Sequence, residues 1–246
     1  MTKTYSDEKL LIFLPTLNEE LNVVPLIVEI ANIFPNANYL IIDDNSTDKT
    51  VENLLSLNFS KLKIIVRKNA FGIGSAHKDA LMFAIRNDYS ILVSMDSDGT
   101  HRPADIPLLL DKVNTCDIVI GSRFLAKKSI IDWSLGRRFL TYAGHLVTKF
   151  GLDLDFDCSS GMRAYNLSKQ DFGVVESIDA NDYDFFYKTI FLFHKKFQMN
   201  IQEVSLKLLP RFSGDSKLTV FLVIKSVLNL VSDILKFRKA SFFNLN

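Results

Sequence analysis

The sequence is poor in several features that would mark particular classes of protein. Its 246 residues include only two cysteines, Cys116 and Cys158, which form neither a disulfide framework nor a metal-ligand spacing. The formal net charge is only +1, so the charge gives no reason to expect a nucleic acid partner. No window contains the roughly 18 apolar residues that a membrane-spanning helix needs. Disulfide-rich, nucleic-acid-binding and membrane-spanning classes are therefore not expected.

What remains is the composition of an ordinary globular enzyme. Apolar residues make up 48% of the chain and charged residues 23%, both near the averages for globular proteins. The length allows one large domain, or a domain with one elaborated half. The polar stretch 1–9 leads straight into an apolar run, so no signal peptide is expected. Together with the scarcity of cysteine, this favours a reducing cytoplasm.

Apolar runs and helical patterns alternate in the first half of the chain. The runs expected to be strands are 10–14, 39–42, 62–66, 90–95 and 117–120, and the expected helices are 20–34, 48–57, 75–87 and 103–113. Strands that are almost wholly apolar and alternate with helices are typical of a parallel sheet covered on both faces. The sequence therefore predicts an α/β fold with a Rossmann-like, mostly parallel central sheet.

Two carboxylates follow the fourth apolar run directly. Asp96 and Asp98 come one residue apart at the expected carboxyl end of a buried strand, which is where open α/β sheets bind ligands. Hard oxygen ligands of this kind suit Mg²⁺ or Mn²⁺, with substrate phosphates completing the coordination shell. The alternative is an Asp-rich turn without a ligand, since Asp98-Gly99 is itself a turn signal.

Three further polar loops are expected at the same edge, because right-handed crossovers bring every strand-to-helix loop there. Asp43 and Asp44 can accept hydrogen bonds from ribose hydroxyls or a base, or form a turn before the next helix, as we expect for Asp48. The turn Gly72-Ile73-Gly74 allows a ligand to approach backbone N–H groups closely. Of two nearby histidines, His77 is expected to pack or lie on the surface, and His101 is close enough to support the acidic pair.

Seven blocks in register resemble the family-two inverting glycosyltransferases, over about residues 10 to 220. The last of them resemble the dolichyl-phosphate or polyprenyl-phosphate mannose synthases in particular. The blocks are Pro15-Thr16-Leu17-Asn18-Glu19, Asp43-Asp44-Asn45-Ser46, Gly72-Ile73-Gly74-Ser75-Ala76, Asp96-Ser97-Asp98-Gly99, Gly121-Ser122-Arg123-Phe124, the stretch 157–165 (DCSSGMRAY) and the stretch 211–218 (RFSGDSKL).

This resemblance implies a GT-A fold, with a nucleoside diphosphate sugar lying along the loop edge. GDP-mannose is the expected donor. The residues implied in binding the nucleotide sugar are Pro15, Thr16, Asn18, Glu19, Asp43, Asp44, Gly74 and Asp96. Asp96, Asp98 and Thr100 would hold Mg²⁺ or Mn²⁺, although the family usually has Gln or Ser in place of Thr100. The metal would neutralise charge on the departing diphosphate, which is Lewis-acid catalysis.

The implied acceptor is a polyprenyl or dolichyl phosphate. A phosphate oxygen is already anionic near neutral pH, so it needs positive charge to hold it and no general base. Arginine suits phosphate oxygens because its planar fork binds them bidentately. The residues implied in holding the acceptor phosphate are Arg123, Arg137, Thr141, Arg211 and Lys217, and the catalytic set is Asp98, Arg123 and Arg211.

Two other functions remain open from the sequence. A GT-A enzyme using another nucleotide sugar, such as UDP-glucose, or a glycan hydroxyl acceptor would need a base for the hydroxyl, and Asp157 is the candidate. A protein of a different class would bind nucleotide sugars or assemble with partners without turnover. The intact acidic pair, Asp96 and Asp98, argues against this last reading.

The chain is expected to divide into a GT-A domain, 1–217, and a basic amphipathic helix with a tail, 218–246. The GT-A domain would comprise a nucleotide-sugar half, about 8–123, and an acceptor half, about 124–217. From Lys207 onward there are seven basic and two acidic residues. Within 218–237 the polar residues form one stripe and leave a broad apolar face, which suits an anionic membrane surface, although the face could instead pack on the core.

A second apolar and basic stretch, 133–150, allows the same two interpretations. With a polyprenyl acceptor, the membrane surface is the more natural partner for the stretch 218–237, while both interpretations stay open for 133–150. We therefore expect a protein of the cytoplasm that associates peripherally with the membrane.

Overall fold

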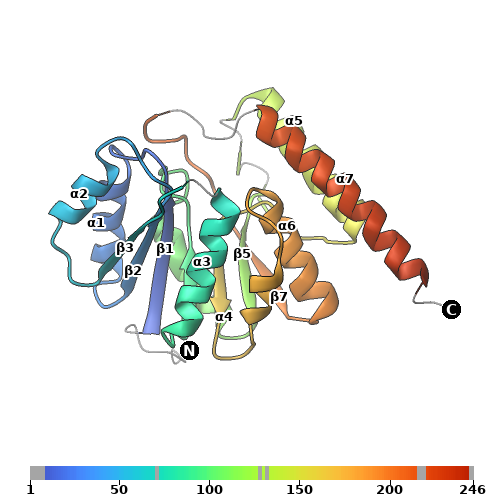
Figure 1. Cartoon of the computed structure of the whole chain (residues 1–246), viewed down its shortest axis with the longest axis horizontal. Coiled ribbons are helices and arrows are strands. Elements are labelled where there is room, and N and C mark those ends of the chain that lie inside the picture. Colours follow the sequence, from blue (N-terminus) through green and yellow to red (C-terminus); the bar gives the residue numbers. More distant parts are fainter. Residues whose placement is uncertain (1–8, 70–71, 127–128, 131–132, 215–219, 244–246) are drawn as a thin grey trace.

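The computed structural model describes residues 9–69, 72–126, 129–130, 133–214 and 220–243. These described residues form a seven-stranded sheet in the order β3-β2-β1-β4-β6-β5-β7 (Figure 1). The strands are β1 (Leu10–Thr16), β2 (Asn38–Asp43), β3 (Leu62–Val66), β4 (Ile91–Ser94), β5 (Ile118–Ser122), β6 (Arg163–Asn166) and β7 (Ile201–Ser205).

The sheet is mostly parallel, as the alternation of strands and helices predicts. The pairs β1–β2, β1–β4, β2–β3 and β5–β7 are parallel, and only β6 runs antiparallel to its neighbours β4 and β5. The five expected strands correspond to β1–β5. The sequence pattern did not reveal β6 and β7, because each is short and mixes polar with apolar residues, as in Arg-Ala-Tyr-Asn of β6.

Helices cover both faces of the sheet. They are α1 (Val23–Ile33), α2 (Thr50–Ser56), α3 (Ile73–Arg86), α4 (Ile106–Val113) and α6 (Asp184–Phe191), with short turns η2 (Pro103–Asp105), η3 (Gly173–Ser177) and a π-helical η4 (Leu192–Lys196). The four helices expected in the first half are confirmed, with ends that differ by up to three residues. Asp48 accepts a hydrogen bond from the amide of Thr50 at 2.9 Å and so forms the turn expected before α2.

Two apolar cores result from the alternation of side chains along the strands. Leu11 and Phe13 of β1 face one core, together with the inner sides of α3 and α6. Leu10 and Ile12 face the other core, together with α1 and α4. This burial on both faces explains why the central strands are nearly continuous runs of Leu, Ile and Val. His77 of α3 is buried in the first core, where its ring packs edge-on against Phe13, so the packing role expected for it is confirmed.

The helices α5 (Leu135–Leu152) and α7 (Val220–Phe243) lie outside this sandwich, side by side along one flank (Figure 1). Their backbones approach closely at Gly151, where an added Cβ would lie 2.4 Å from the side chain of Ile234. The helix expected at 218–237 is therefore present, and it extends six residues further than expected. No helix among the described residues is long and apolar enough to cross a bilayer.

Part of the polar stripe of α7 contacts the protein. Lys225 pairs with Asp182 at 2.6 Å, Asn229 donates to Asp184, and Asp233 accepts from the hydroxyl of Tyr187 at 2.8 Å. The apolar side chains on the opposite side of the helix are left exposed. They are Val227, Leu228, Val231 and Leu235.

Helix α5 is equally unusual, because most of its large apolar side chains are exposed. Phe139 and Phe150 are each 71% exposed. The others are Leu135, Leu140, Tyr142, Leu146 and Val147. The alternative that the stretch 133–150 belongs to the core is therefore wrong for these side chains.

Candidate active site

The polar loops that follow β1, β2 and β4 meet at one edge of the sheet, as expected. The hydroxyl of Ser97 donates to the carbonyl of Pro15 at 2.6 Å, which joins the loop after β4 to the loop after β1. The amide of Asp44 donates to the carbonyl of Thr16 at 2.9 Å and joins the loop after β2 to the same place. Parallel strands explain this convergence, because their carboxyl ends share an edge.

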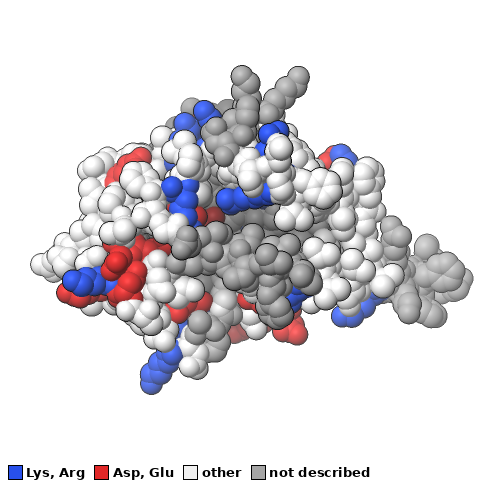
Figure 2. Space-filling model, turned by 90° about the horizontal axis from the view of Figure 1, so that it is seen from above, with Lys and Arg blue, Asp and Glu red and all other residues white. Residues whose placement is uncertain are grey.

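A cavity of about 870 Å³ opens beside these loops and continues between α5 and α7. Figure 2 shows this face hollowed, with basic side chains beside the opening and acidic side chains within it. The expected site residues that line the cavity are Pro15, Thr16, Glu19, Asp44, Asp96, Asp98, Thr100, Arg123, Arg137, Thr141 and Arg211. Asn18, Asp43, Gly74 and Asp157 are not among the lining residues, and Lys217 lies outside the described part of the chain.

Asp96 lies in the cavity wall with one carboxylate oxygen left without a partner. Its Oδ1 is buried and has no hydrogen-bond partner in the part of the chain that the structure describes. A Cβ added to Gly161 would lie only 2.7 Å from this oxygen, so a side chain there would obstruct it. Burial raises the pKa of Asp96. A buried carboxylate oxygen without a donor suits coordination of a cation.

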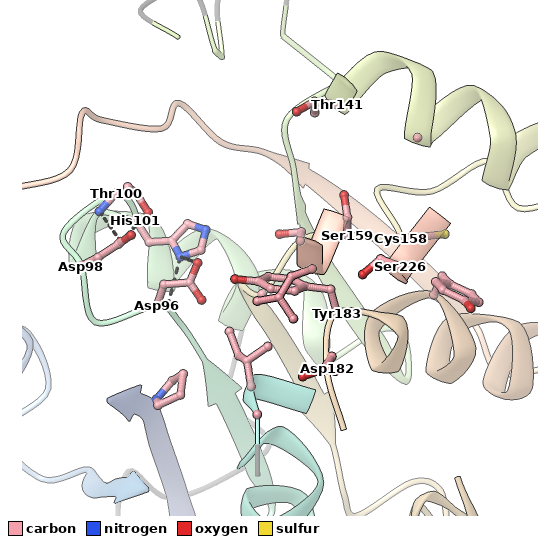
Figure 3. Close-up of a pocket in the computed structure, with 18 of the residues that line it drawn as sticks. Asp96, Asp98, Thr100, His101, Thr141, Cys158, Ser159, Asp182, Tyr183 and Ser226 are labelled. Atoms are coloured by element: carbon pink, nitrogen blue, oxygen red, sulfur yellow. Dashed lines mark hydrogen bonds and ion pairs between the residues drawn. The ribbon is translucent and has the colours of Figure 1, made fainter. Parts of the chain in front are cut away.

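Asp98 is held from both sides. Its Oδ1 accepts from the amide of Thr100 at 3.0 Å and from the Thr100 hydroxyl at 2.7 Å, while its Oδ2 faces the guanidinium of Arg211 at 3.0 Å (Figure 3 shows the Thr100 contact). The hydroxyl of Thr100 is therefore turned toward Asp98 and orients it. The resemblance implied Thr100 as a metal ligand, whereas in this structure its hydroxyl donates to the carboxylate of Asp98.

Arg211 bridges two acidic residues. Besides Asp98, it forms a close ion pair with Glu19, and its Nε donates to the carbonyl of Ser213 at 2.9 Å. All of these groups are mostly buried. Arg211 therefore neutralises Glu19 and Asp98 in this structure. It would have to leave Asp98 before it could hold an acceptor phosphate.

Arg123 is anchored by Asp157. Its Nε donates to Asp157 Oδ2 at 2.7 Å, and its side chain also reaches Asp157 Oδ1 and the hydroxyl of Ser159. Although burial by itself would raise the pKa of Asp157, the guanidinium of Arg123 lowers it overall. A fully buried, ion-paired carboxylate that does not line the cavity is poorly suited to act as a general base. The structure therefore favours a positioning role for Asp157.

Arg137 and Thr141 reach the cavity from the first turns of α5. The guanidinium of Arg137 lies 3.6 Å from the centre of the Trp133 ring, which fixes its plane by a cation–π contact. The Thr141 hydroxyl donates to the carbonyl of Arg137 at 2.9 Å. Partial burial lowers the pKa of Arg137, and the charge of Arg123 adds to this effect. Arg123 and Arg137, two of the three arginines implied in phosphate binding, therefore lie near enough for their charges to interact, whereas Arg211 is paired with Asp98 and Glu19.

Several expected nucleotide-binding residues hold the loops together. Asp43 is fully buried, and its carboxylate accepts from Thr16 at 2.8 Å and from the amide of Ser46 at 2.8 Å. Asn18 accepts from the amide of Thr47 at 2.8 Å. These contacts fulfil the turn interpretation for Asp43, and they make both residues supports for the cavity rather than part of its lining.

Gly74 also has a packing role. A Cβ at this position would lie 2.3 Å from the carbonyl oxygen of Asp182 and 2.6 Å from Phe185, so only glycine lets α3 approach this segment. The space beside Gly74 is filled by the protein itself. Close approach of a ligand is therefore not what requires glycine at this position.

Some residues that line the cavity, or support residues that line it, were not predicted from the sequence. Arg67 pairs with Asp44 and donates to Ser75 at 2.6 Å, and its position directly after β3 could have indicated a role at the loop edge. Asp182 and Tyr183 also line the cavity (Figure 3), but they follow no strand, so no sequence signal marked them. Arg163, which belongs to the block 157–165, is fully buried in β6 and donates to backbone carbonyls and to Thr189, so it supports the fold rather than lining the cavity.

The donor set for a metal is small. No group of three His, Cys, Asp or Glu side chains that could hold a metal ion is found among the described residues. Asp96 and Asp98 offer two carboxylates to the cavity from the same strand end. Such a pair suits Mg²⁺ or Mn²⁺ that takes its remaining ligands from water and substrate phosphates.

The chain matches the model of glycosyl transferase family 2 over residues 11–170. It is 28% identical over 225 residues to an undecaprenyl-phosphate mannosyltransferase of Micrococcus luteus, covering 90% of this chain and 92% of that protein. It is 30% identical over 178 residues to a polyprenol monophosphomannose synthase of Mycolicibacterium smegmatis, covering 69% and 67%.

A solved structure with a similar fold is glucosyl-3-phosphoglycerate synthase from Mycobacterium tuberculosis in complex with Mn²⁺, UDP-glucose and phosphoglyceric acid. The TM-score is 0.67 at 19% identity, covering 92% of this chain and 79% of that one. This likeness concerns the fold, which is the GT-A fold expected from the sequence. With the family match, the similar mannosyltransferases and this fold together, the chain belongs to glycosyl transferase family 2 and is a glycosyltransferase.

Proposed function

We propose that this glycosyltransferase moves a mannosyl group from GDP-mannose to a polyprenyl phosphate, with Mg²⁺ or Mn²⁺, at the cytoplasmic face of a membrane. The observation that carries the proposal is the composition of the one continuous cavity. It joins the acidic pair Asp96 and Asp98 to the guanidinium groups of Arg123 and Arg137, and it continues between the apolar helices α5 and α7. The relatives, named as an undecaprenyl-phosphate mannosyltransferase and a polyprenol monophosphomannose synthase, support mannose as the sugar and a polyprenyl phosphate as the acceptor.

The acidic end suits the donor. Asp96 keeps a buried oxygen without a partner, and Asp98 stands beside it at the same strand end, so the two carboxylates fit a divalent ion bound to a diphosphate. When bound, the ion supplies Lewis-acid stabilisation of the departing nucleoside diphosphate. Asp44, held in place by Arg67, offers a carboxylate toward the nucleoside from the loop after β2.

The basic end suits the acceptor phosphate. Arg123 is fixed by Asp157, and Arg137 is fixed by the ring of Trp133, so both guanidinium groups are oriented before a ligand arrives. Such preorganisation lowers the cost of holding an anion in line with the sugar. A phosphate nucleophile carries its own negative charge, so the engagement of Asp157 with Arg123 is no obstacle to the reaction. A glycan hydroxyl acceptor would need a base, and Asp157, the candidate considered for that role, is engaged by Arg123.

The apolar end suits a prenyl chain and a membrane surface. Leu140 of α5 and Leu222 and Leu230 of α7 line the cavity where it passes between the two helices. On the outside, Leu228 and Phe139 are 64% and 71% exposed. An exposed apolar patch of this kind, beside an opening for a lipid, favours burial in the interface of a bilayer.

The substrates are tested by supplying purified protein with GDP-mannose or UDP-glucose, and with either a polyprenyl phosphate or a glycan as acceptor. We expect mannosyl transfer to the polyprenyl phosphate with inversion at the anomeric carbon, no product in EDTA, and recovery when Mn²⁺ or Mg²⁺ is returned. Transfer that proceeds fully in EDTA would contradict the metal. Transfer only to the glycan would contradict the lipid acceptor.

Membrane attachment is tested by sedimentation with vesicles that contain phosphatidylglycerol. Replacing Leu228 and Val231 of α7 by Ser should release the protein, while activity on a short-chain, water-soluble acceptor persists. The matched control replaces Leu21 and Leu55 by Ser, because these leucines are each 64% exposed but lie near α1 and α2. Equal release by both pairs, or no binding of the wild-type protein to vesicles, would argue against α7 as the attachment surface.

A further inference from the structure

His101 is a cavity residue to which neither the family resemblance nor the relatives assign a role. Its side chain is only 4% exposed, and it lines the cavity beside Asp96. The backbone amide of Asp96 donates to Nδ1 of His101 at 3.1 Å. The imidazole thus holds the main chain of a residue proposed to bind the metal, from the loop five residues further along.

This hydrogen bond fixes which nitrogen carries the proton. Because Nδ1 accepts from the amide of Asp96, its lone pair is in use, and the proton of the neutral ring must be on Nε2. Nε2 has no hydrogen-bond partner among the described residues and is not sealed from the cavity. Figure 3 shows the ring with this second nitrogen on the side away from Asp96, toward the space before Tyr183.

The surroundings define what Nε2 could bind. The carboxylates of Asp96 and Asp98 can only accept hydrogen bonds when ionised, whereas the N–H at Nε2 can only donate. Burial raises the pKa of the Tyr183 hydroxyl to about 12, so that group also keeps its proton at neutral pH. His101 and Tyr183 therefore present an N–H and an O–H donor beside the acidic pair, where the donor substrate would lie.

We propose that His101 has two functions in this site: it positions Asp96 through Nδ1, and it donates from Nε2 to an oxygen of the donor substrate. The proposal rests on the proposed function, because it requires a nucleoside diphosphate sugar beside Asp96. The oxygen belongs either to the diphosphate or to a hydroxyl of the transferred sugar. Both are acceptors that a neutral, fixed N–H recognises.

Two substitutions separate the two functions. In His101→Asn the amide oxygen can take the place of Nδ1 and keep the bond from Asp96, but no donor reaches the place of Nε2. In His101→Gln the longer amide can bring a donor to that place, while the acceptor for Asp96 is lost. His194→Asn is a matched control, because His194 is also partly buried but lies outside the cavity, against Phe156.

The experiment measures calorimetric binding of GDP, GDP-mannose, UDP and UDP-glucose in the presence of Mn²⁺, together with thermal unfolding and steady-state kinetics. We expect His101→Asn to keep the wild-type melting temperature and Mn²⁺ affinity, and to bind the sugar nucleotide about tenfold to a hundredfold more weakly. His101→Gln should recover part of the sugar-nucleotide affinity and lose Mn²⁺ affinity. His194→Asn should match the wild type.

The binding data also identify the acceptor oxygen. An equal loss for GDP and GDP-mannose assigns Nε2 to the diphosphate, and a loss confined to GDP-mannose assigns it to the sugar. Wild-type affinity and kcat/KM in His101→Asn would overturn the proposal while leaving the proposed function standing. A wild-type protein that binds none of the four nucleotides would overturn both.

Discussion

Replacing Arg211 by Ala should make the protein bind Mn²⁺ more tightly in the absence of substrates. Arg211 lies 3.0 Å from Asp98 and also pairs with Glu19, so a cation that coordinates Asp98 must first displace a guanidinium. The side chains of Arg211 and Asp98 are only 18% and 20% exposed, so solvent screens this pair weakly. A charge-assisted contact of this kind contributes about 1.5–3 kcal/mol.

Removal of that competition should tighten Mn²⁺ binding by about tenfold to a hundredfold, since each 1.4 kcal/mol is a factor of ten. Isothermal titration of Mn²⁺ into wild type and Arg211→Ala measures the change. Arg211→Lys keeps the charge without the fork and should fall between them. Arg138→Ala removes an arginine of α5 that makes no ion pair with Asp98 among the described residues, and it should change the affinity by less than about threefold. Mn²⁺ affinity that is unchanged or weaker in Arg211→Ala would refute the reasoning.

Three further outcomes are expected. Asp98→Ala should leave the fold intact by circular dichroism but lower kcat by about 10³-fold, equivalent to about 4 kcal/mol of lost leaving-group stabilisation; full activity would remove Asp98 from the metal site. Asp157→Asn should retain more transfer to polyprenyl phosphate than Arg211→Ala, and the reverse order would favour a hydroxyl acceptor and a base. Burial lowers the pKa of His77 to about 3, from an unfolded value near 6.5, so below about pH 6.5 the unfolded chain takes up a proton that the folded chain refuses. The free energy of unfolding should therefore decrease as the pH is lowered below about 6.5, with about 2 kcal/mol lost by pH 5 from this residue. In urea denaturation measured at several pH values, His77→Leu should lack this part of the pH dependence.

The strands and helices of the first half were predictable because burial on both faces imposes a simple pattern. A strand such as β4 must be apolar on both sides, and the chemistry then gathers in the polar loop that follows it, as Asp96 and Asp98 do. The place of Asp96 and Asp98 at this edge of the sheet could therefore be predicted from the apolar strand that precedes them in the sequence. β6 was not predicted because it places the buried charge of Arg163 inside the sheet, where the carbonyl groups of Cys158, Ser160 and Phe186 accept its hydrogen bonds.

The pairing of charges could not be predicted in the same way. Arg211 is 113 residues from Asp98 in the sequence, and Arg123 is 34 residues from Asp157. No local sequence pattern indicates such distant partners. From the sequence, Arg211 was therefore implied in phosphate binding, and Asp157 was considered as a base, without regard to the charge that each one pairs with. The structure gives each an opposite charge, which changes the expected effect of mutating it.

Helix α7 illustrates a different limit. The sequence established a polar stripe and an apolar face, but the ordinary assumption about amphipathic helices would turn the apolar face inward. Tertiary contacts determine the orientation instead. Asp233 and Asn229 form hydrogen bonds with Tyr187 and Asp184 of α6, and Lys225 pairs with Asp182 just before α6. Leu228 and Val231 are left exposed. Three specific polar contacts on one side fix an orientation that hydrophobicity alone would not choose.

The separation of charge along the cavity bears directly on the proposed reaction. Transfer from a nucleoside diphosphate to a lipid phosphate requires two anions to lie within one cavity of about 870 Å³. Two like charges in a partly buried site repel each other by several kcal/mol, because the effective dielectric constant is far below that of water. A metal at the acidic pair would neutralise the diphosphate, and the fixed guanidinium groups of Arg123 and Arg137 would neutralise the acceptor. Arg211 is the one cation in the described cavity that contacts the acidic pair directly, so its release from Asp98 on metal binding would add a third positive charge for the acceptor only once the donor is in place.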